Sequence, residues 1–213
     1  MSAQLVTSSY RYVGVIDEIC ALRWETLTNA EVAHVALAYY YFSIQFRESL
    51  VLACEQHPTD SKLKMLWREE CDTDNLSPWP GIAVAREKMN HDEFMRRALL
   101  LGKPRSEHVE YQGHEYLAAT RNLDPICRAK SIASYEDEGL CRVFQAMLRA
   151  PYWEGTTQRA FQFFLRKHIE FDTDAHDGHG ALSKHLQSDD SVLPLWSAFS
   201  NLLVYSVPRL RHG

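Results

Sequence analysis

The sequence predicts an all-α fold in which one bundle of seven or eight helices fills a single domain over residues 1–213. Apolar residues recur at three- and four-residue spacing in one segment after another, almost to the C-terminus. Alternating runs of β-branched residues between tight turns, which are typical of strands, are missing. With 46% hydrophobic and 24% charged residues, the 213-residue chain has a globular composition and enough length to bury one sizeable core.

Periodicity, capping residues and helix stops give the expected boundaries. The second helix opens at the capping pair Thr28-Asn29 and stops before His57-Pro58. It is apolar nearly all round, so we expect it at the centre of the bundle. The fourth helix ends at Gly102, shortly before a proline. The predicted helices cover about 12–27, 29–55, 61–71, 87–101, 107–121, 125–150, 156–186 and 192–205.

Charge and hydropathy exclude two classes of partner. The formal net charge is −5, and no segment gathers Lys and Arg into a stripe, so we expect no nucleic acid partner. No stretch approaches the roughly 20 apolar residues of a membrane span, and the N-terminus lacks a basic start and an apolar run, which favours a cytoplasmic protein without a membrane partner. The five cysteines are scattered without a CxxC pair and are interpreted as reduced core thiols.

The strongest chemical signal lies in residues 168–182. At about 100° per residue, the apolar stripe of Phe161, Phe164 and Leu165 continues onto His168 and Asp172. Burying such groups alone costs several kcal/mol, whereas a bound cation satisfies and orients them. Carboxylates mixed with imidazoles, without a thiolate, favour iron or manganese over structural zinc, and we expect iron. The alternative is a solvated helix end whose acidic residues and histidines face water.

Two other helices carry polar residues on their apolar stripes. His91 shares its stripe with Phe94 and Met95, where a leucine would be ordinary. Glu136 joins the stripe of the sixth helix, whereas Glu138 does not. Together with residues 168–182, they fit a carboxylate-bridged di-metal site inside a helical bundle.

Two further glutamates are candidates for the same site. Glu48 lies in the middle of the apolar second helix. Of Glu69 and Glu70, only one can face the core, and Glu70 is on the side of Leu63 and Trp67. For Glu70 the alternative is an acidic helix end without a function.

The segment from His168 to Leu182, with Phe163-Phe164 before it and a Glu-bearing helix about thirty residues upstream, resembles the heme-oxygenase-like diiron oxidases. The resemblance covers about residues 35–205, and its most specific part is His-x-x-x-Asp followed by a further His. It implies a heme-oxygenase-like fold in which two ferrous ions replace the heme. The implied metal ligands are Glu48, Glu70, His91, Glu136, His168, Asp172 and one of His176 or His179.

Two ligand positions stay open. The interval from Glu70 to His91 is longer than the family pattern, so Glu87, one turn before His91, is a rival for Glu70. At the other end, His176 keeps uninterrupted helical spacing, but His179 with the Gly-Ala-Leu after it is more similar to the family's ending. A helix break near Gly178 would bring His179 within reach, and we favour His179.

The resemblance implies an iron-dependent oxidoreductase that activates O2 and oxidises a small molecule, such as an amino acid, an amine or a fatty acid, in natural-product biosynthesis. An electron donor is an expected partner, and a homodimer is a possible assembly. N-oxygenation, desaturation and C–C cleavage are all open outcomes. Arg47 and Arg86 are candidate clamps for a substrate carboxylate.

There are three alternative functions. The first is a metal-free relative on the same fold that resembles pyrroloquinoline quinone synthase or the thiaminase-like hydrolases. Heme oxygenase itself is disfavoured, because its axial histidine would lie on the first helix and residues 12–27 contain none. A non-catalytic helical interaction protein would leave the inward carboxylates unexplained.

Overall fold

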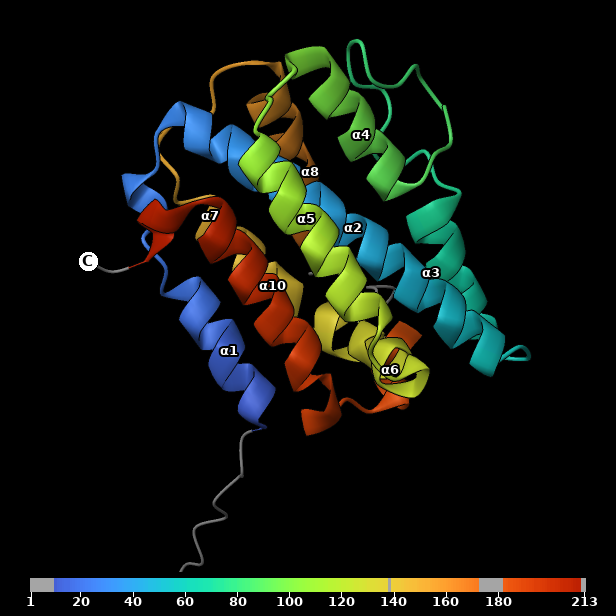
Figure 1. Ribbon diagram of the computed structural model, residues 1–213. Coiled ribbons are helices and arrows are strands. Elements are labelled where there is room, and N and C mark those ends of the chain that lie inside the picture. The colour runs from blue at the N-terminus through green and yellow to red at the C-terminus, as the bar shows by residue number, and fades with distance from the viewer. Residues whose placement is uncertain (1–9, 138, 173–181, 212–213) are drawn as a thin grey trace, which may run out of the picture.

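A computed structural model describes residues 10–137, 139–172 and 182–211. Within these ranges the protein is built from helices and contains no strand, which confirms the predicted all-α class (Figure 1). The α-helices are α1 (Arg11–Cys20), α2 (Asn29–Gln56), α3 (Ser61–Cys71), α4 (His91–Gly102), α5 (Glu107–Arg121), α6 (Pro125–Glu136), α7 (Gly139–Met147), α8 (Thr156–Asp172) and α10 (Leu193–Ser206). Short 3-10 turns are η1 (Trp24–Thr26), η2 (Lys184–Leu186), η3 (Asp190–Val192) and η4 (Pro208–Leu210).

Helix α2 is the centre of the bundle, as its sequence predicts. It begins with a capping box in which the Thr28 hydroxyl accepts a hydrogen bond from the Glu31 N–H at 3.3 Å. In return, the Glu31 carboxylate accepts one from the Thr28 N–H at 2.8 Å. The helix then packs against α3, α4, α5, α6, α8 and α10. Because other helices surround α2, it can be buried only if its surface is apolar on all sides.

The helix predicted over residues 125–150 is two helices, so the described residues form nine α-helices rather than seven or eight. Helix α6 ends at Glu136, and Asp137 leaves the helical conformation. At the start of α7, a Cβ on Gly139 would lie 2.3 Å from the Ser134 carbonyl oxygen and 2.9 Å from the Trp196 ring. Glycine is therefore required for the close approach of α7 to the last turn of α6 and to α10.

The predicted start of the fourth helix, at Glu87, is also wrong, because α4 begins at His91. Residues 72–90 form a folded connection instead, in which the Met89 N–H donates to the Thr73 carbonyl at 2.9 Å. This pairing brings the two ends of the connection together, so the end of α3 meets the start of α4 (Figure 1). The first helix is shorter than expected as well, since α1 ends at Cys20.

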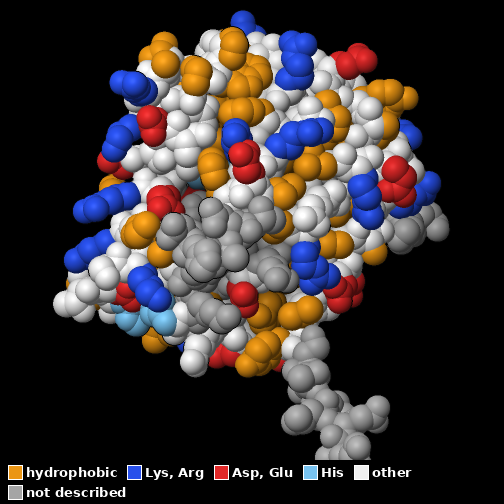
Figure 2. All heavy atoms as spheres, turned by 180° about the vertical axis from the view of Figure 1, so that it is seen from behind, with side chains coloured by type: hydrophobic (Ala, Val, Ile, Leu, Met, Phe, Trp, Pro, Cys, Tyr) orange, Lys and Arg blue, Asp and Glu red, His pale blue; other side chains and the backbone are white. Residues whose placement is uncertain are grey.

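No helix of the described ranges is long and apolar enough to cross a membrane. On the side shown in Figure 2, basic and acidic side chains are interspersed among hydrophobic ones.

Candidate metal centre

Three buried side chains from different helices meet at one point. Glu70 lies in the last turn of α3, His91 is the first residue of α4, and His168 lies near the end of α8. Each offers a ligand atom, and these atoms all lie within 4.8 Å of one another. Their exposed fractions are only 5%, 6% and 6%, respectively. The inward orientation predicted for these residues is therefore confirmed, and the structure brings them together.

The two histidines and the carboxylate share close contacts. His91 Nδ1 lies 2.6 Å from Glu70 Oε2 and 3.0 Å from His168 Nε2. On α3, Glu70 continues the buried side of Leu63 and Leu66, whereas Trp67, which was expected on that side, is 38% exposed.

Hydrogen bonds on the far side of each ring decide which nitrogen carries the proton. His168 Nδ1 donates to the Phe164 backbone carbonyl at 2.9 Å, since a carbonyl can only accept. His91 Nε2 lies 3.1 Å from Asn75 Oδ1, and Asn75 donates its amide N–H to the Glu69 carbonyl at 3.2 Å. That second bond fixes the Asn75 amide with its oxygen toward His91, so His91 Nε2 is the donor.

It follows that, with both rings neutral, the unprotonated nitrogens His91 Nδ1 and His168 Nε2 face each other at 3.0 Å, and Glu70 Oε2 lies 2.6 Å from His91 Nδ1. Three electron-rich atoms then face one buried position, where they repel one another unless a cation or a shared proton lies between them. Ligand histidines in metalloproteins commonly donate their other N–H to a carbonyl or carboxylate in this way. The donor set thus fits a metal ion.

A partly enclosed cavity adjoins this cluster. Aromatic rings form part of its wall: the Phe164 ring stacks on the His168 ring with centroids 4.0 Å apart, and it meets the His91 ring edge-on at 5.7 Å. Such walls exclude water, which strengthens electrostatic interactions at the cluster. The cavity is lined by Tyr39, Ser43, Phe46, Arg47, Glu70, Cys71, His91, Asp92, Glu136, Leu140, Phe164 and His168.

Cys71 lines the same cavity but does not belong to the cluster of possible ligands. Burial, with a further contribution from the neighbouring Glu70 carboxylate, raises the pKa of its thiol to about 12. The thiol is therefore neutral at physiological pH, and nitrogen and oxygen are the donors that the cluster offers. For donors of this type, the sequence predicts iron or manganese.

Glu136, the last residue of α6, also faces this cavity and is 7% exposed. Its predicted inward orientation is confirmed, although its oxygens are not among the atoms that lie within 4.8 Å of one another.

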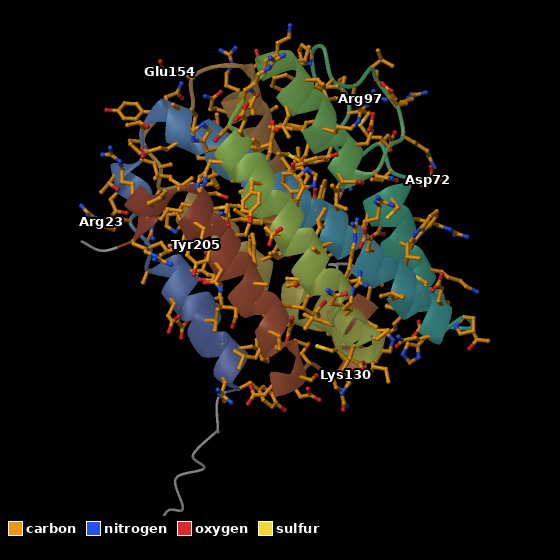
Figure 3. The ribbon with its side chains drawn as sticks, viewed as in Figure 1. Arg23, Asp72, Arg97, Lys130, Glu154 and Tyr205 are labelled. Carbon is orange, nitrogen blue, oxygen red and sulfur yellow. The ribbon has the colours of Figure 1, made fainter. Side chains whose placement is uncertain are left out.

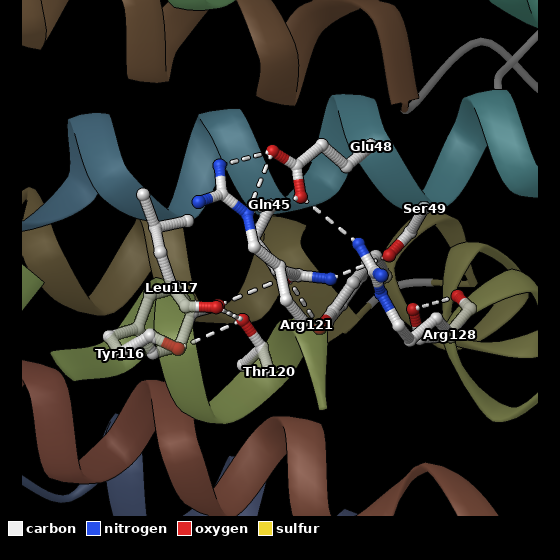
Figure 4. Close-up of polar contacts among 10 residues, drawn as sticks. Gln45, Glu48, Ser49, Tyr116, Leu117, Thr120, Arg121 and Arg128 are labelled. Atoms are coloured by element: carbon white, nitrogen blue, oxygen red, sulfur yellow. Dashed lines mark hydrogen bonds and ion pairs between the residues drawn. The ribbon is translucent and has the colours of Figure 1, made fainter. Parts of the chain in front are cut away.

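Glu48 is placed elsewhere, which corrects the expectation that it faces the same site. Its carboxylate accepts hydrogen bonds from Arg121 Nη2 at 2.6 Å and from Arg128 Nη2 at 3.1 Å (Figure 4). Tyr39, Ser43 and Phe46 define the side of α2 that lines the cavity. Glu48 follows Tyr39 by nine residues, and at about 100° per residue it points about 180° away.

The structure also distinguishes Glu70 from its rival Glu87. Glu87 lies in the connection before α4 and pairs with Arg97 Nη1 at 2.6 Å, and it also accepts a hydrogen bond from the Val84 N–H. Arg97 projects from α4 on the outer side of the bundle (Figure 3). Hence Glu70 is the glutamate that lies beside His91.

The remaining predicted ligands lie wholly or partly outside the described part of the protein. Asp172 ends α8, and its side chain lies outside the described part of the protein. His176 and His179 lie outside the described residues altogether.

No sequence pattern pointed to two residues near the cluster. Asn75 lies in a connection rich in turn formers, where an asparagine is ordinary. Asp92 follows His91 in the first turn of α4, where an acidic residue is expected for the helix dipole alone. Of the two arginines considered as carboxylate clamps, Arg47 lines the cavity and Arg86 does not.

No protein-family model, curated protein or solved structure matches this chain.

Proposed function

We propose that the protein is a non-heme iron oxidase or oxygenase that uses O2 to oxidise a small organic molecule. The observation that carries this proposal is the convergence of two imidazoles and one carboxylate, with fixed tautomers, at one buried position. Two histidines and one carboxylate with other coordination positions open are the ligand set of non-heme ferrous oxygenases.

Ferrous iron in such a site would bind O2 and supply electrons to it, and an external donor would restore the ferrous state. The protein's own residues have distinct tasks. Glu70 balances part of the cation's charge, while Asn75 and the Phe164 carbonyl hold the two rings in orientation. Phe164, Tyr39 and Phe46 keep water from the cavity in which the substrate would lie.

The proposal includes a second iron. Glu136 faces the same cavity and offers the carboxylate that a bridged pair of ions needs. In this proposal, Asp172 and His179 complete the ligand set, as the resemblance to heme-oxygenase-like diiron oxidases implies. Glu48 is left out, because its carboxylate is engaged by two arginines.

Anaerobic reconstitution with ferrous iron, followed by metal analysis and O2 uptake, tests the proposal. We expect about two irons per chain in the wild type, because the proposed ligands are twice the three that a two-histidine, one-carboxylate ferrous site uses. His91→Ala and His168→Ala should each lose iron and O2 uptake, whereas His114→Ala, on the exposed side of α5, should keep both. About one iron per chain would reject the second site. A wild type that binds no iron would reject the proposal and favour a metal-free enzyme.

A further inference from the structure

The cavity beside the candidate metal centre has a cation and an anion side by side on its wall. Arg47 of α2 and Asp92 of α4 both line the cavity, and Arg47 Nε donates to Asp92 Oδ2 at 3.0 Å. We propose that this pair binds a zwitterionic α-amino acid, with the substrate carboxylate on Arg47 and its ammonium group on Asp92. The inference names the substrate class of the proposed oxidase and rests on that function for turnover, although binding can be measured without iron.

Arg47 has hydrogen-bond donors that no described residue engages. Its side chain is 37% exposed, so it is within reach of an entering molecule. Only its Nε is engaged by a hydrogen-bond partner among the described residues, which leaves its two terminal NH2 groups for a ligand. A guanidinium can bind a carboxylate with two parallel hydrogen bonds, so these groups suit a substrate carboxylate.

Asp92 has a carboxylate oxygen that accepts no hydrogen bond from the described residues. Its side chain is 12% exposed, and its Oδ1 is buried without a hydrogen-bond partner in the described part of the protein. A buried carboxylate oxygen without a donor costs free energy, which an entering ammonium group would recover by donating to it. Asp92 lines the same cavity as His91 and His168, so a molecule held here lies next to the candidate metal centre.

The pairing of opposite charges discriminates among the three substrate types that the sequence left open. A fatty acid could use Arg47, but its carboxylate would be repelled by Asp92. An amine could use Asp92, but its ammonium group would be repelled by Arg47. In an α-amino acid the two charged groups are attached to one carbon, so both are satisfied by residues that are themselves 3.0 Å apart.

The rest of the cavity indicates the kind of side chain. Phe46, Leu140 and Phe164 form the apolar part of its wall. We therefore expect an apolar side chain, such as that of leucine or phenylalanine.

Isothermal titration of the metal-free full-length chain with matched probes tests the inference. The probes are L-phenylalanine, 2-phenylethylamine and 3-phenylpropionic acid, together with L-leucine, 3-methylbutylamine and 4-methylpentanoic acid. We expect at least one amino acid to bind about tenfold or more tightly than its matched amine and acid. Arg47→Gln and Asp92→Asn should each weaken that binding about tenfold or more. Arg209→Gln, which removes a surface ion pair to Glu31, should leave it unchanged.

The same titrations give the outcomes that would overturn the inference. An amine or acid that binds as tightly as its amino acid would reject zwitterion recognition, and so would unchanged binding in Arg47→Gln or Asp92→Asn. No binding by any probe would reject it too. Iron uptake by the wild type after anaerobic reconstitution, measured separately, distinguishes the two proposals. A wild type that takes up no iron but binds the amino acid would reject only the oxidase, and a wild type that takes up iron but does not bind the amino acid would reject only the substrate class.

Discussion

Two hydrogen bonds on the outer sides of the imidazole rings decide how His91 and His168 present their nitrogens. The Phe164 carbonyl is part of the same helix as His168, so that ring is oriented locally. Asn75 reaches His91 from the connection between α3 and α4, so the second ring depends on how this connection folds. The candidate metal centre therefore has one ring held by its own helix and one held by a loop.

Replacing Asn75 with alanine should weaken ferrous iron binding roughly 10- to 100-fold, because His91 loses the acceptor that fixes its tautomer. Competition with a chelator under anaerobic conditions measures this affinity. Asn75→Asp keeps an acceptor oxygen and should restore most of it, while Asn122→Ala, at the exposed end of α5, is the matched control. Equal affinity in Asn75→Ala and the wild type would show that Asn75 does not position the ring.

Glu48→Gln should leave the iron content unchanged and lower the free energy of unfolding by roughly 1–3 kcal/mol. The carboxylate joins Arg121 to Arg128, and the Arg128 side chain is only 10% exposed, so a neutral partner leaves a largely buried guanidinium poorly satisfied. Urea unfolding and metal analysis measure the two effects. Loss of iron in this variant would instead make Glu48 a ligand.

At the scale of elements, α2 is joined to its neighbours by close contact and by a buried polar network. The Gln45 side-chain oxygen accepts hydrogen bonds from the Tyr116 hydroxyl of α5 at 3.0 Å and the Tyr135 hydroxyl of α6 at 3.2 Å. Its amide nitrogen donates to the Ser49 hydroxyl at 2.7 Å (Figure 4). Because these groups are satisfied by one another, their burial between three helices is not costly, and it specifies how the helices pack.

Gly113→Ala should destabilise the protein by about 1–3 kcal/mol, although alanine is the better helix former. A Cβ at this position of α5 would lie 2.2–2.4 Å from atoms of the Tyr41 ring on α2, so the two helices would have to move apart. Gly14→Ala in α1 is a matched control, because a Cβ there meets nothing within 4 Å. The control should be neutral or slightly stabilising in thermal unfolding. Equal effects of the two substitutions would contradict close packing of α2 on α5.

The contact between α6 and η3 should depend on pH. Lys130, on α6 (Figure 3), pairs with Asp189 at 2.8 Å, and this contact together with hydrogen bonds from Ser191 lowers the pKa of Asp189 from 3.8 to about 2. Because the pKa of Asp189 is lower in the folded protein than in the unfolded chain, its ionised carboxylate stabilises the folded state above pH 3.8. This stabilisation is lost as the pH falls toward 2. Thermal unfolding of Asp189→Asn should therefore differ from the wild type at pH 5 and converge with it near pH 2. A difference that stays constant over this range would contradict the shift.

At the scale of the whole molecule, the candidate ligands come from α3, α4 and α8, which meet only in the folded bundle. A metal held by all three would therefore bind the native state and not the unfolded chain. Binding of this kind stabilises the folded protein in proportion to the affinity.

Ferrous iron at about 100 times its Kd should stabilise the wild type by about 2.7 kcal/mol. For a chain of this size, that corresponds to an increase in Tm of roughly 5–10 °C. His168→Ala should show little or no such increase, because one of the three ligands is missing. Anaerobic thermal unfolding with and without ferrous iron compares the two proteins. A variant that shifts as much as the wild type would remove His168 from the site.

Local patterns in the sequence determined most of the helices and the inward polar residues. The boundaries of α3 and α5 agree with the prediction, because capping groups act within a single turn: Asp60 accepts from backbone N–H groups of α3, and Ser106 accepts from one of α5. The positions of His91 and His168 followed from apolar stripes, since a stripe identifies the buried side of an amphipathic helix.

Other features were decided only by contacts between segments far apart in the chain. Glu48 could not be oriented from the sequence, because α2 is apolar on all sides and has no single buried stripe. The need for glycine at position 139 comes from the nearby Ser134 carbonyl and the Trp196 ring of α10, and the hydrogen bond from His91 to Asn75 depends on the folding of residues 72–90. The side-by-side position of Arg47 and Asp92 likewise exists only where α2 packs on α4. The periodicity of apolar residues shows which side of a single helix is buried. These features depend also on where a second segment lies, and that is decided by packing in the folded protein.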